Sequence, residues 1–221
     1  MSRGDRIFED RADAGRRLAG RLGRYGDESP MVLALPRGGV PVGYEISRLL
    51  GVPLDVIVAR KLGAPDQPEL GIGAVAPGGV RVLNAAAVRA IGVTEDYLDR
   101  VTRRETEEME RRLRKFRGGR PEPKVRGQTA ILVDDGLATG VTARAAIEAL
   151  RRMEPKRLVL AVPVCAAATV AWIRSEVDDL VCLEIPPDLG AIGFWYRDFD
   201  QTSDEEVIRL LEAARRGGKV L

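Results

Sequence analysis

The 221-residue sequence contains no histidine, and this absence excludes more chemistry than any other feature of its composition. Without histidine the chain cannot build a Ser-His-Asp triad, a Cys-His pair, a histidine general base or most catalytic zinc and non-haem iron sites. Cysteine is nearly as scarce, because Cys165 and Cys182 are the only two and cannot form a four-thiolate metal site. Both lie in apolar runs, so we expect buried free thiols rather than a disulfide.

Long apolar runs and a strong net charge are also missing. No apolar stretch reaches about 18 residues, the minimum for a membrane-spanning helix, and the first residues, MSRGDRIFED, lack the apolar core of a signal peptide. We therefore expect a cytoplasmic protein with no membrane partner. Thirty-five basic and thirty-three acidic residues leave a net charge of +2, so no nucleic-acid partner is expected. An enzyme of this composition must use carboxylates, backbone amides, basic side chains or a hard cation.

The length and composition predict a single globular domain over residues 1–221. Apolar residues make up 45% of the chain and charged residues 31%, and a domain typically takes about 100–200 residues. Short apolar runs alternate with segments of helical periodicity, which predicts an α/β fold with a mostly parallel sheet flanked by helices. The expected strands are 31–35, 54–59, 130–133, 158–164 and 180–183, and the expected helices are 7–25, 42–50, 94–117, 142–152, 166–177 and 204–216.

The segment between the second and third of these strands contains an inserted helix, expected at about 94–117. Thr94 is the predicted N-cap, and the helix is expected to stop at Gly118. The Gly- and Pro-rich segment 60–79 before it predicts a long loop or a hairpin, with 71–76 and 80–83 as possible short strands. Residues 100–126 carry eleven basic and five acidic groups, which indicates either a solvated helix face or a surface that attracts a phosphate-bearing ligand or a partner.

The sharpest motif is ILVDDGLATGVT at 131–142, where an apolar strand ends in Asp134 and Asp135 and a short loop leads into a helix. Ligands of open α/β sheets bind at the carboxyl ends of strands. The loop and helix start offer backbone N–H groups, hydroxyls and the positive end of the helix dipole to a phosphate. The carboxylates, expected to face solvent, can accept hydrogen bonds from a diol or sit near a hard cation. The motif therefore predicts a site for a phosphorylated sugar; the alternative is that the two acids only cap a turn.

A second motif, LPRGGVPV at 35–42, also follows a strand and precedes a helix. Gly38 and Gly39 let the backbone approach a ligand closely, and Arg37 adds a fixed positive charge. This pattern predicts a second part of the same site, with an ordinary Pro-Gly turn as the alternative.

The 131–142 motif resembles the phosphoribosyl pyrophosphate signature of type I phosphoribosyltransferases. The chain as a whole is similar to a bacterial group of predicted phosphoribosyltransferases, through LPRGGVPVGYEIS, LDVIVARKLGAP, ELGIGAV, ILVDDGLATGVTARAA and WYRDFDQTSDEEV. The resemblance implies a Rossmann-like fold with a small hood. It also implies that Asp134 and Asp135 bind the ribose hydroxyls and stand near Mg²⁺, through water or the ligand. The residues that would cradle the 5′-phosphate are Ala138, Thr139, Gly140, Val141 and Thr142.

The same resemblance assigns a role to the residues of the 35–42 motif and to the start of the next loop. A pyrophosphate-binding loop would consist of Pro36, Arg37, Gly38 and Gly39, with a non-proline cis peptide at Pro36–Arg37. Arg60 and Lys61 would begin a mobile loop that closes over pyrophosphate, so that Arg37, Arg60 and Lys61 are the expected catalytic cations. The alternative for Arg60 and Lys61 is a pair of surface cations.

A hood over the acceptor is implied for about 185–200 together with the N-terminal segment. Phe194, Trp195 and Tyr196 are consecutive, so they cannot all face one way. One aromatic ring would stack on the acceptor while the others pack, and core packing of all three is the alternative.

The expected reaction is displacement of pyrophosphate from phosphoribosyl pyrophosphate by a nitrogen nucleophile, an acceptor that the sequence does not identify. The transition state would resemble a ribosyl oxocarbenium ion, so no protein nucleophile is needed. Ala138 stands where hypoxanthine and guanine enzymes of the family carry an Asp, which argues against a 6-oxopurine acceptor. A non-catalytic regulator that binds phosphoribosyl pyrophosphate, a hydrolase or phosphorylase of a phosphoribosyl compound, and a homodimer all stay open.

Overall fold

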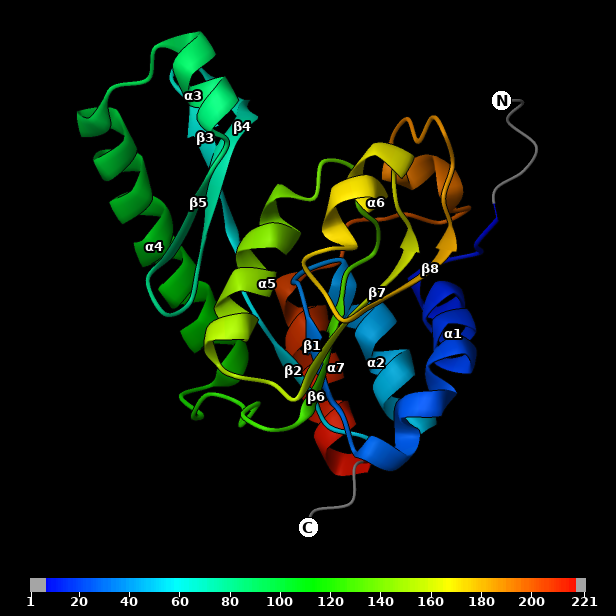
Figure 1. Cartoon of the computed structure of the whole chain (residues 1–221). Helices are drawn as coiled ribbons and strands as arrows, with labels where there is room; N and C mark the ends of the chain where they lie inside the picture. Colours follow the sequence, from blue (N-terminus) through cyan, green and yellow to red (C-terminus); the bar gives the residue numbers. More distant parts are fainter. Residues whose placement is uncertain (1–6, 218–221) are drawn as a thin grey trace.

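The computed structural model describes residues 7–217 and is built around a five-stranded sheet (Figure 1). The strand order is β2-β1-β6-β7-β8, and every neighbouring pair is parallel. The α/β fold with a parallel sheet, expected from the sequence, is confirmed. The strands are β1 (Met31–Ala34), β2 (Leu54–Val56), β6 (Thr129–Val133), β7 (Arg157–Val164) and β8 (Asp179–Glu184).

Successive residues of each strand face opposite layers of helices. Val32 and Ala34 of β1 belong to one core, and Leu33 between them belongs to the other. Because the strands are buried on both faces, the sequence shows them as continuous apolar runs. The first layer consists of α1 (Arg11–Leu22), α2 (Gly39–Leu50) and α7 (Asp204–Gly217), and the second of α5 (Val141–Arg152) and α6 (Ala167–Ile173).

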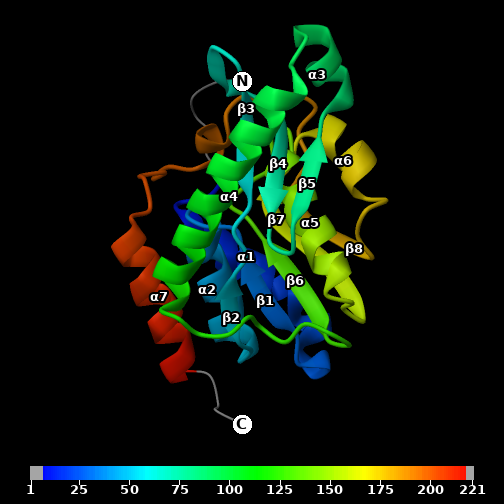
Figure 2. The ribbon, with the colours of Figure 1, turned by 90° about the vertical axis from the view of Figure 1, so that its left-hand side faces the viewer.

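An arm, residues 60–117, is inserted between β2 and β6 (Figure 1). Its three strands form an antiparallel sheet that lies between α4 and α5, and Figure 2 shows α4 crossing these strands. Leu62 and Ile72 pack on Leu98 of α4, whereas Ala74 and Val80 join the core formed with α5. The elements of the arm are β3 (Arg60–Ala64), β4 (Gln67–Ala76), β5 (Val80–Leu83), α3 (Ala85–Ile91) and α4 (Glu95–Arg117).

The segment expected as a long loop or hairpin is the β3–β4 hairpin, and the possible strands 71–76 and 80–83 are confirmed within β4 and β5. One boundary differs, because β2 ends at Val56 rather than at residue 59. Both ends of α4 agree with the sequence: Oγ1 of Thr94 accepts a hydrogen bond from the Tyr97 N–H at 3.3 Å, and Gly118 has a left-handed φ of 60°.

Segments 8–11 and 195–200 lie side by side and form a contact that we call the clasp. The Phe8 N–H donates to the Trp195 carbonyl at 3.0 Å, and the Arg197 N–H donates to the Phe8 carbonyl at 2.8 Å. The rings of Phe8 and Tyr196 have centroids 5.3 Å apart. The N-terminal segment therefore contacts the segment expected to form the hood. Short 3₁₀-helices at Gly23–Glu28 (η1) and Ile192–Trp195 (η2) complete the elements.

Both cysteines are free thiols, as the sequence indicated. Burial raises the pKa of Cys165 to about 11 and that of Cys182 to about 12, so neither is a reactive thiolate at neutral pH. In the described part of the chain, no helix combines the length and the apolarity needed to cross a bilayer.

Candidate active site

The two sequence motifs meet at the carboxyl edge of the parallel sheet. β1 and β6 are neighbours, so the loop that follows β1 lies against Asp134 and Asp135, which follow β6. A Cβ atom on Gly38 would lie 1.9 Å from Oδ2 of Asp135, and a Cβ on Gly39 would lie 2.7 Å from the Val133 carbonyl oxygen. Only glycine fits at these positions without moving the acids. The peptide between Pro36 and Arg37 is cis, as the resemblance implied.

The two carboxylates are mostly buried, which corrects the expectation that they face solvent. The Asp135 side chain is only 14% exposed. Burial raises the pKa of Asp134 well above its usual range, and the neighbouring Asp135 charge raises it further. Burial also raises the pKa of Asp135, while Arg11 opposes this shift.

Each carboxylate keeps one oxygen free of protein hydrogen bonds. Oδ1 of Asp134 accepts a hydrogen bond from the Asp135 N–H at 2.9 Å, and Oδ2 of Asp135 accepts one from Nε of Arg11 at 2.8 Å. Within residues 7–217, Oδ2 of Asp134 and Oδ1 of Asp135 have no such partner. The pair can therefore accept hydrogen bonds from two hydroxyl groups.

The loop from Ala138 to Thr142 leads into α5 and presents its backbone to the same edge. Gly140 is the N-cap, with a left-handed φ of 69°. In the described part of the chain, the backbone N–H groups of Thr139 through Thr142 donate to no protein acceptor. The Thr169 hydroxyl donates to the Ala138 carbonyl and fixes the loop against α6. Open N–H groups at a helix N-terminus suit a phosphate.

The predicted catalytic cations are not gathered at one place. Arg37 is loosely paired with Asp204 at 3.8 Å and lies beside the acids. Arg60 and Lys61 instead begin β3: Arg60 contacts the largely buried Glu105 at 2.7 Å, and Nζ of Lys61 donates to the Glu69 carbonyl at 2.8 Å. The structure places both in the arm and away from the lining of the hollow described next.

A hollow of about 450 Å³ opens beside Asp135 and is here called the carboxyl-edge hollow. The three consecutive aromatics of the predicted hood, Phe194, Trp195 and Tyr196, do not line the carboxyl-edge hollow. Phe194 is 71% exposed, Nε1 of buried Trp195 donates to the Leu189 carbonyl, and the buried Tyr196 hydroxyl donates to the Asp135 carbonyl at 2.6 Å. The lining residues are Arg11, Arg37, Gly38, Asp135, Ala191, Ile192, Gly193, Phe199, Gln201 and Thr202.

Sequence reasoning missed two features of this hollow. Arg11 reaches it from α1, across 124 positions of sequence from its partner Asp135. A single arginine among thirty carries no local signal of such a contact. The apolar wall comes from Ile192 and Phe199, which flank the three consecutive aromatics, so the aromatic run pointed to the right segment but not to the lining side chains.

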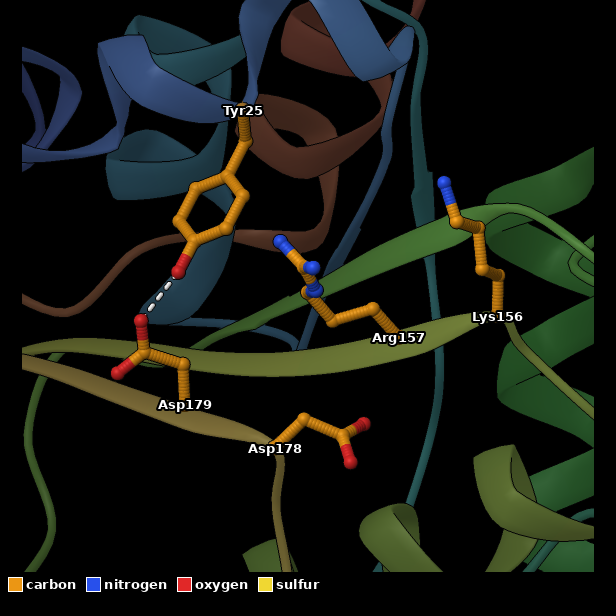
Figure 3. A pocket seen from close by; sticks show the side chains of 5 residues that line it. All are labelled: Tyr25, Lys156, Arg157, Asp178 and Asp179. Carbon is orange, nitrogen blue, oxygen red and sulfur yellow. Dashed lines mark hydrogen bonds between the residues drawn. The ribbon is translucent and has the colours of Figure 1, made fainter.

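A second hollow, of about 400 Å³, lies where β7 and β8 begin and is here called the amino-edge hollow (Figure 3). Figure 3 shows the Tyr25 hydroxyl directed at Asp179, with which it forms a hydrogen bond. Arg157 pairs with Glu28 at 2.9 Å. The residues that line this hollow are Tyr25, Lys156, Arg157, Asp178 and Asp179.

Asp178 and Asp179, the acids of the amino-edge hollow, both have cationic partners. Asp178 pairs with Arg151 at 2.8 Å and also accepts from the Leu158 N–H, and Asp179 pairs with Arg24. Among the residues described, Lys156 is the one charged lining residue without a salt bridge. These charges compensate one another and hold the strand starts together.

Paired acids, a loop with open N–H groups and a loop that requires glycine thus lie together at the carboxyl edge of a parallel sheet. The chain belongs to the phosphoribosyl transferase domain family, whose model matches residues 5–196. Proteins from two strains of Mycobacterium tuberculosis, CDC 1551 / Oshkosh and H37Rv, are each named "Putative phosphoribosyl transferase". Both are 46% identical to this chain over 211 residues, which is 96% of this chain and 48% of theirs.

The chain thus spans about half the length of the curated relatives it matches. A crystal structure of TT1426 from Thermus thermophilus shares 41% sequence identity and superposes with a TM-score of 0.78. That match covers 92% of this chain and 97% of the Thermus chain, and it confirms the fold class.

Proposed function

We propose that this chain transfers the 5-phosphoribosyl group of phosphoribosyl pyrophosphate to a nitrogen acceptor and releases pyrophosphate. The observation that carries the proposal is the convergence of three different binding elements at one edge of the sheet. Asp134 and Asp135 each offer a free oxygen, the 138–142 loop offers open N–H groups, and the 36–39 loop approaches both through glycine. Membership of the family supports the same conclusion.

The proposed donor orientation follows from the chemistry of each element. The 5′-phosphate would accept hydrogen bonds from the N–H groups of Thr139 to Thr142, and the ribose hydroxyls would donate to Asp134 and Asp135. Pyrophosphate would lie against Pro36 to Gly39, with Arg37 as its cation. Holding both ends of the donor leaves C1 exposed to the carboxyl-edge hollow.

In the reaction, the bond from C1 to the pyrophosphate oxygen breaks and a bond from C1 to the acceptor nitrogen forms. The acceptor nitrogen loses its proton to water. Charge develops on the departing pyrophosphate, so groups that stabilise it lower the barrier, and no histidine is needed.

The residues present fit a magnesium ion that arrives with the donor. Within residues 7–217, no three metal-binding side chains of His, Cys, Asp or Glu form a group. Mg²⁺ is commonly bound by one or two carboxylates together with water and substrate phosphates. Asp134, with its free oxygen, and Asp135 would hold the ion through water or the donor. When bound, the ion supplies charge neutralisation for pyrophosphate.

Arg60 and Lys61 are proposed to act after a movement of the β3–β4 hairpin. In the described part of the chain, the Lys61 ammonium has polar contacts with Glu69 alone, and the Glu69 side chain is fully exposed, so this contact is weak and easily exchanged. Moving the hairpin toward the pyrophosphate loop would replace Glu69 and Glu105 with leaving-group oxygens.

The proposed acceptor is a flat ring that lies against Ile192 and the edge of the Phe199 ring, since Arg11 and Tyr196 stack on the faces of that ring. Ala138 supplies no acid to a 6-oxopurine, so hypoxanthine and guanine are not expected to be good acceptors. A cytoplasmic location and a place in nucleotide metabolism follow from the sequence alone and stay predictions, as does the single-domain organisation.

Two measurements test the proposal. Calorimetry with phosphoribosyl pyrophosphate and MgCl₂ should show binding, and donor at about 100 times its dissociation constant should stabilise the fold by about 2.7 kcal/mol. A panel of adenine, uracil, orotate, hypoxanthine and guanine with donor and magnesium should then show pyrophosphate release with one of the first three. A folded protein that does not bind the donor would reject the assignment, and efficient turnover of hypoxanthine or guanine would contradict the interpretation of Ala138.

A further inference from the structure

Arg11 makes contacts to three separate parts of the candidate site. It is the first residue of α1, and its Nε donates to Oδ2 of Asp135 at 2.8 Å. Its Nη1 donates to the Asp200 carbonyl at 2.8 Å, and its guanidinium lies 3.8 Å from the centroid of the Phe199 ring. The side chain is only 12% exposed. These contacts fix the guanidinium in one plane.

The other side of this ion pair is closed by the loop after β1. A Cβ on Gly38 would lie 3.2 Å from Nε of Arg11 and still closer to Asp135. The ion pair is therefore held between Phe199 and Gly38, and the clasp keeps the start of α1 in place through the Phe8 contacts. Such packing holds Oδ2 of Asp135 against Arg11.

We propose that Arg11 is a positioning residue that orients Asp135 so that its free Oδ1 accepts the 2-hydroxyl of the ribose. This inference rests on the proposed function. An adjacent pair of carboxylates repels itself, and a cation bonded to one oxygen of Asp135 both offsets that repulsion and fixes the second oxygen. Arginine suits this role because its planar fork can bond a carboxylate and a carbonyl while stacking on an aromatic ring.

The proposal predicts that the site distinguishes ribose from 2-deoxyribose through Arg11. The experiment measures the dissociation constants of ribose 5-phosphate and 2-deoxyribose 5-phosphate by calorimetry without magnesium. A hydrogen bond to a charged acceptor is worth enough to give about tenfold tighter binding of the ribose compound. In Arg11→Gln this ratio should fall to roughly 1–3, because Asp135 loses its orientation. The deoxyribose affinity should change much less, because its phosphate still binds the 138–142 loop.

Two further variants separate orientation from a general loss of structure. Arg16→Gln removes an exposed arginine of the same helix and should keep the wild-type ratio. Arg11→Lys keeps the charge, but one ammonium cannot reproduce the planar guanidinium that contacts Asp135 and Asp200 together. The ratio of ribose to deoxyribose affinity should therefore fall about threefold or more in this variant. Melting temperatures show whether each variant is folded.

The outcomes are distinct. A folded Arg11→Gln or Arg11→Lys protein that keeps the wild-type ratio would overturn the inference, even where phosphoribosyl pyrophosphate binds. A wild-type ratio near unity would overturn it as well, because Asp135 would then accept no 2-hydroxyl. If the wild-type protein binds neither sugar phosphate and not the pyrophosphate donor, the proposed function is wrong and the inference falls with it.

Discussion

The carboxyl-edge and amino-edge hollows lie at opposite edges of the same parallel sheet, and charged side chains of both signs line each of them. They differ in what those charges contact. At the amino edge Asp178 and Asp179 are matched by Arg151 and Arg24. At the carboxyl edge Asp134 and Asp135 retain free oxygens beside a loop of open N–H groups. A charged hollow therefore indicates a ligand site only where its polar groups are left without protein partners.

The largest expected effect comes from replacing the two acids of the carboxyl edge, with an acid of the amino edge replaced as the control. Asp134→Asn combined with Asp135→Asn should weaken phosphoribosyl pyrophosphate binding about 100-fold or more, since two charge-assisted hydrogen bonds are lost. Asp178→Asn should leave donor affinity within about twofold, because its contacts are structural. Calorimetry with donor and magnesium measures both. Unchanged affinity in the double variant would return Asp134 and Asp135 to a turn-capping role.

Gly38 tests whether close packing is what makes the carboxyl edge different. Gly38→Ala places a Cβ against Asp135 and should weaken donor binding about tenfold, with a loss of stability of about 1–3 kcal/mol. The control is Gly20→Ala in α1, where a new Cβ meets no atom within 4 Å. That change should raise stability by up to about 1 kcal/mol, because alanine favours the helix. Equal donor affinity in both variants would show that the loop tolerates a side chain.

Lys61 in the arm and Lys156 at the amino edge form a matched pair of lysines. Lys61→Ala should lower kcat about tenfold while changing the donor KM less, because a mobile hairpin completes its contacts as charge develops on pyrophosphate. Lys156→Ala lies at the amino edge and should leave both constants unchanged. The assay is pyrophosphate release with whichever nucleobase supports turnover. Unchanged turnover in Lys61→Ala would make this lysine a surface cation.

The smallest effects concern stability, and they should have opposite signs at the two edges. Burial raises the pKa of Asp134 in the folded protein. Ionisation of Asp134 therefore lowers the free energy of unfolding once the pH exceeds the ordinary pKa of an Asp. Asp134→Asn should therefore raise the ligand-free melting temperature by a few degrees at pH 7, with the gain shrinking toward pH 4. A melting temperature that falls at pH 7 would contradict this sign.

Arg151 and the Leu158 N–H lower the pKa of Asp178 by hydrogen bonding, so its charge stabilises the fold at neutral pH. Asp178→Asn should lower the melting temperature slightly at pH 7. The difference from wild type should disappear as pH falls through the lowered pKa. Thermal melts of both variants from pH 3 to pH 8 measure the two effects, and parallel pH profiles would remove the distinction between the edges.

Local patterns in the sequence predicted most of the elements that build the site. The apolar runs gave four of the parallel strands nearly to the residue, Thr94 and Gly118 marked the ends of α4, and 131–142 marked the acids and their loop. These features depend on neighbours within a few positions. In the arm, the possible strands 71–76 and 80–83 are confirmed as parts of β4 and β5, but β3 was not predicted, because glycine and proline in 60–79 are typical of loops and the strand depends on packing against α4.

Features that depend on contacts distant in sequence could not be predicted. Glu105 interrupts the apolar face of α4 because it is largely buried against Arg60, which lies 45 positions earlier. On the exposed face of α4, an i,i+4 spacing would also allow Arg111 to pair with Glu107, but Arg111 contacts Glu108 at 2.7 Å. The i,i+4 pairs Glu108–Arg112 and Glu110–Arg114 do form. A helix allows both spacings, so side-chain packing rather than spacing makes the choice.

The pairing of β1 with β6 also bears on how the chain reaches its native state. Met31 lies opposite Ala130, so the two strands that carry the candidate site cannot register until the whole arm has been looped out. Closing a loop of this length costs conformational entropy before any stabilising contact between the two strands forms. Non-local parallel pairings of this kind therefore form slowly. Competence to bind the donor should therefore appear late in refolding, after helix formation, so that ligand binding can report the final step of assembly.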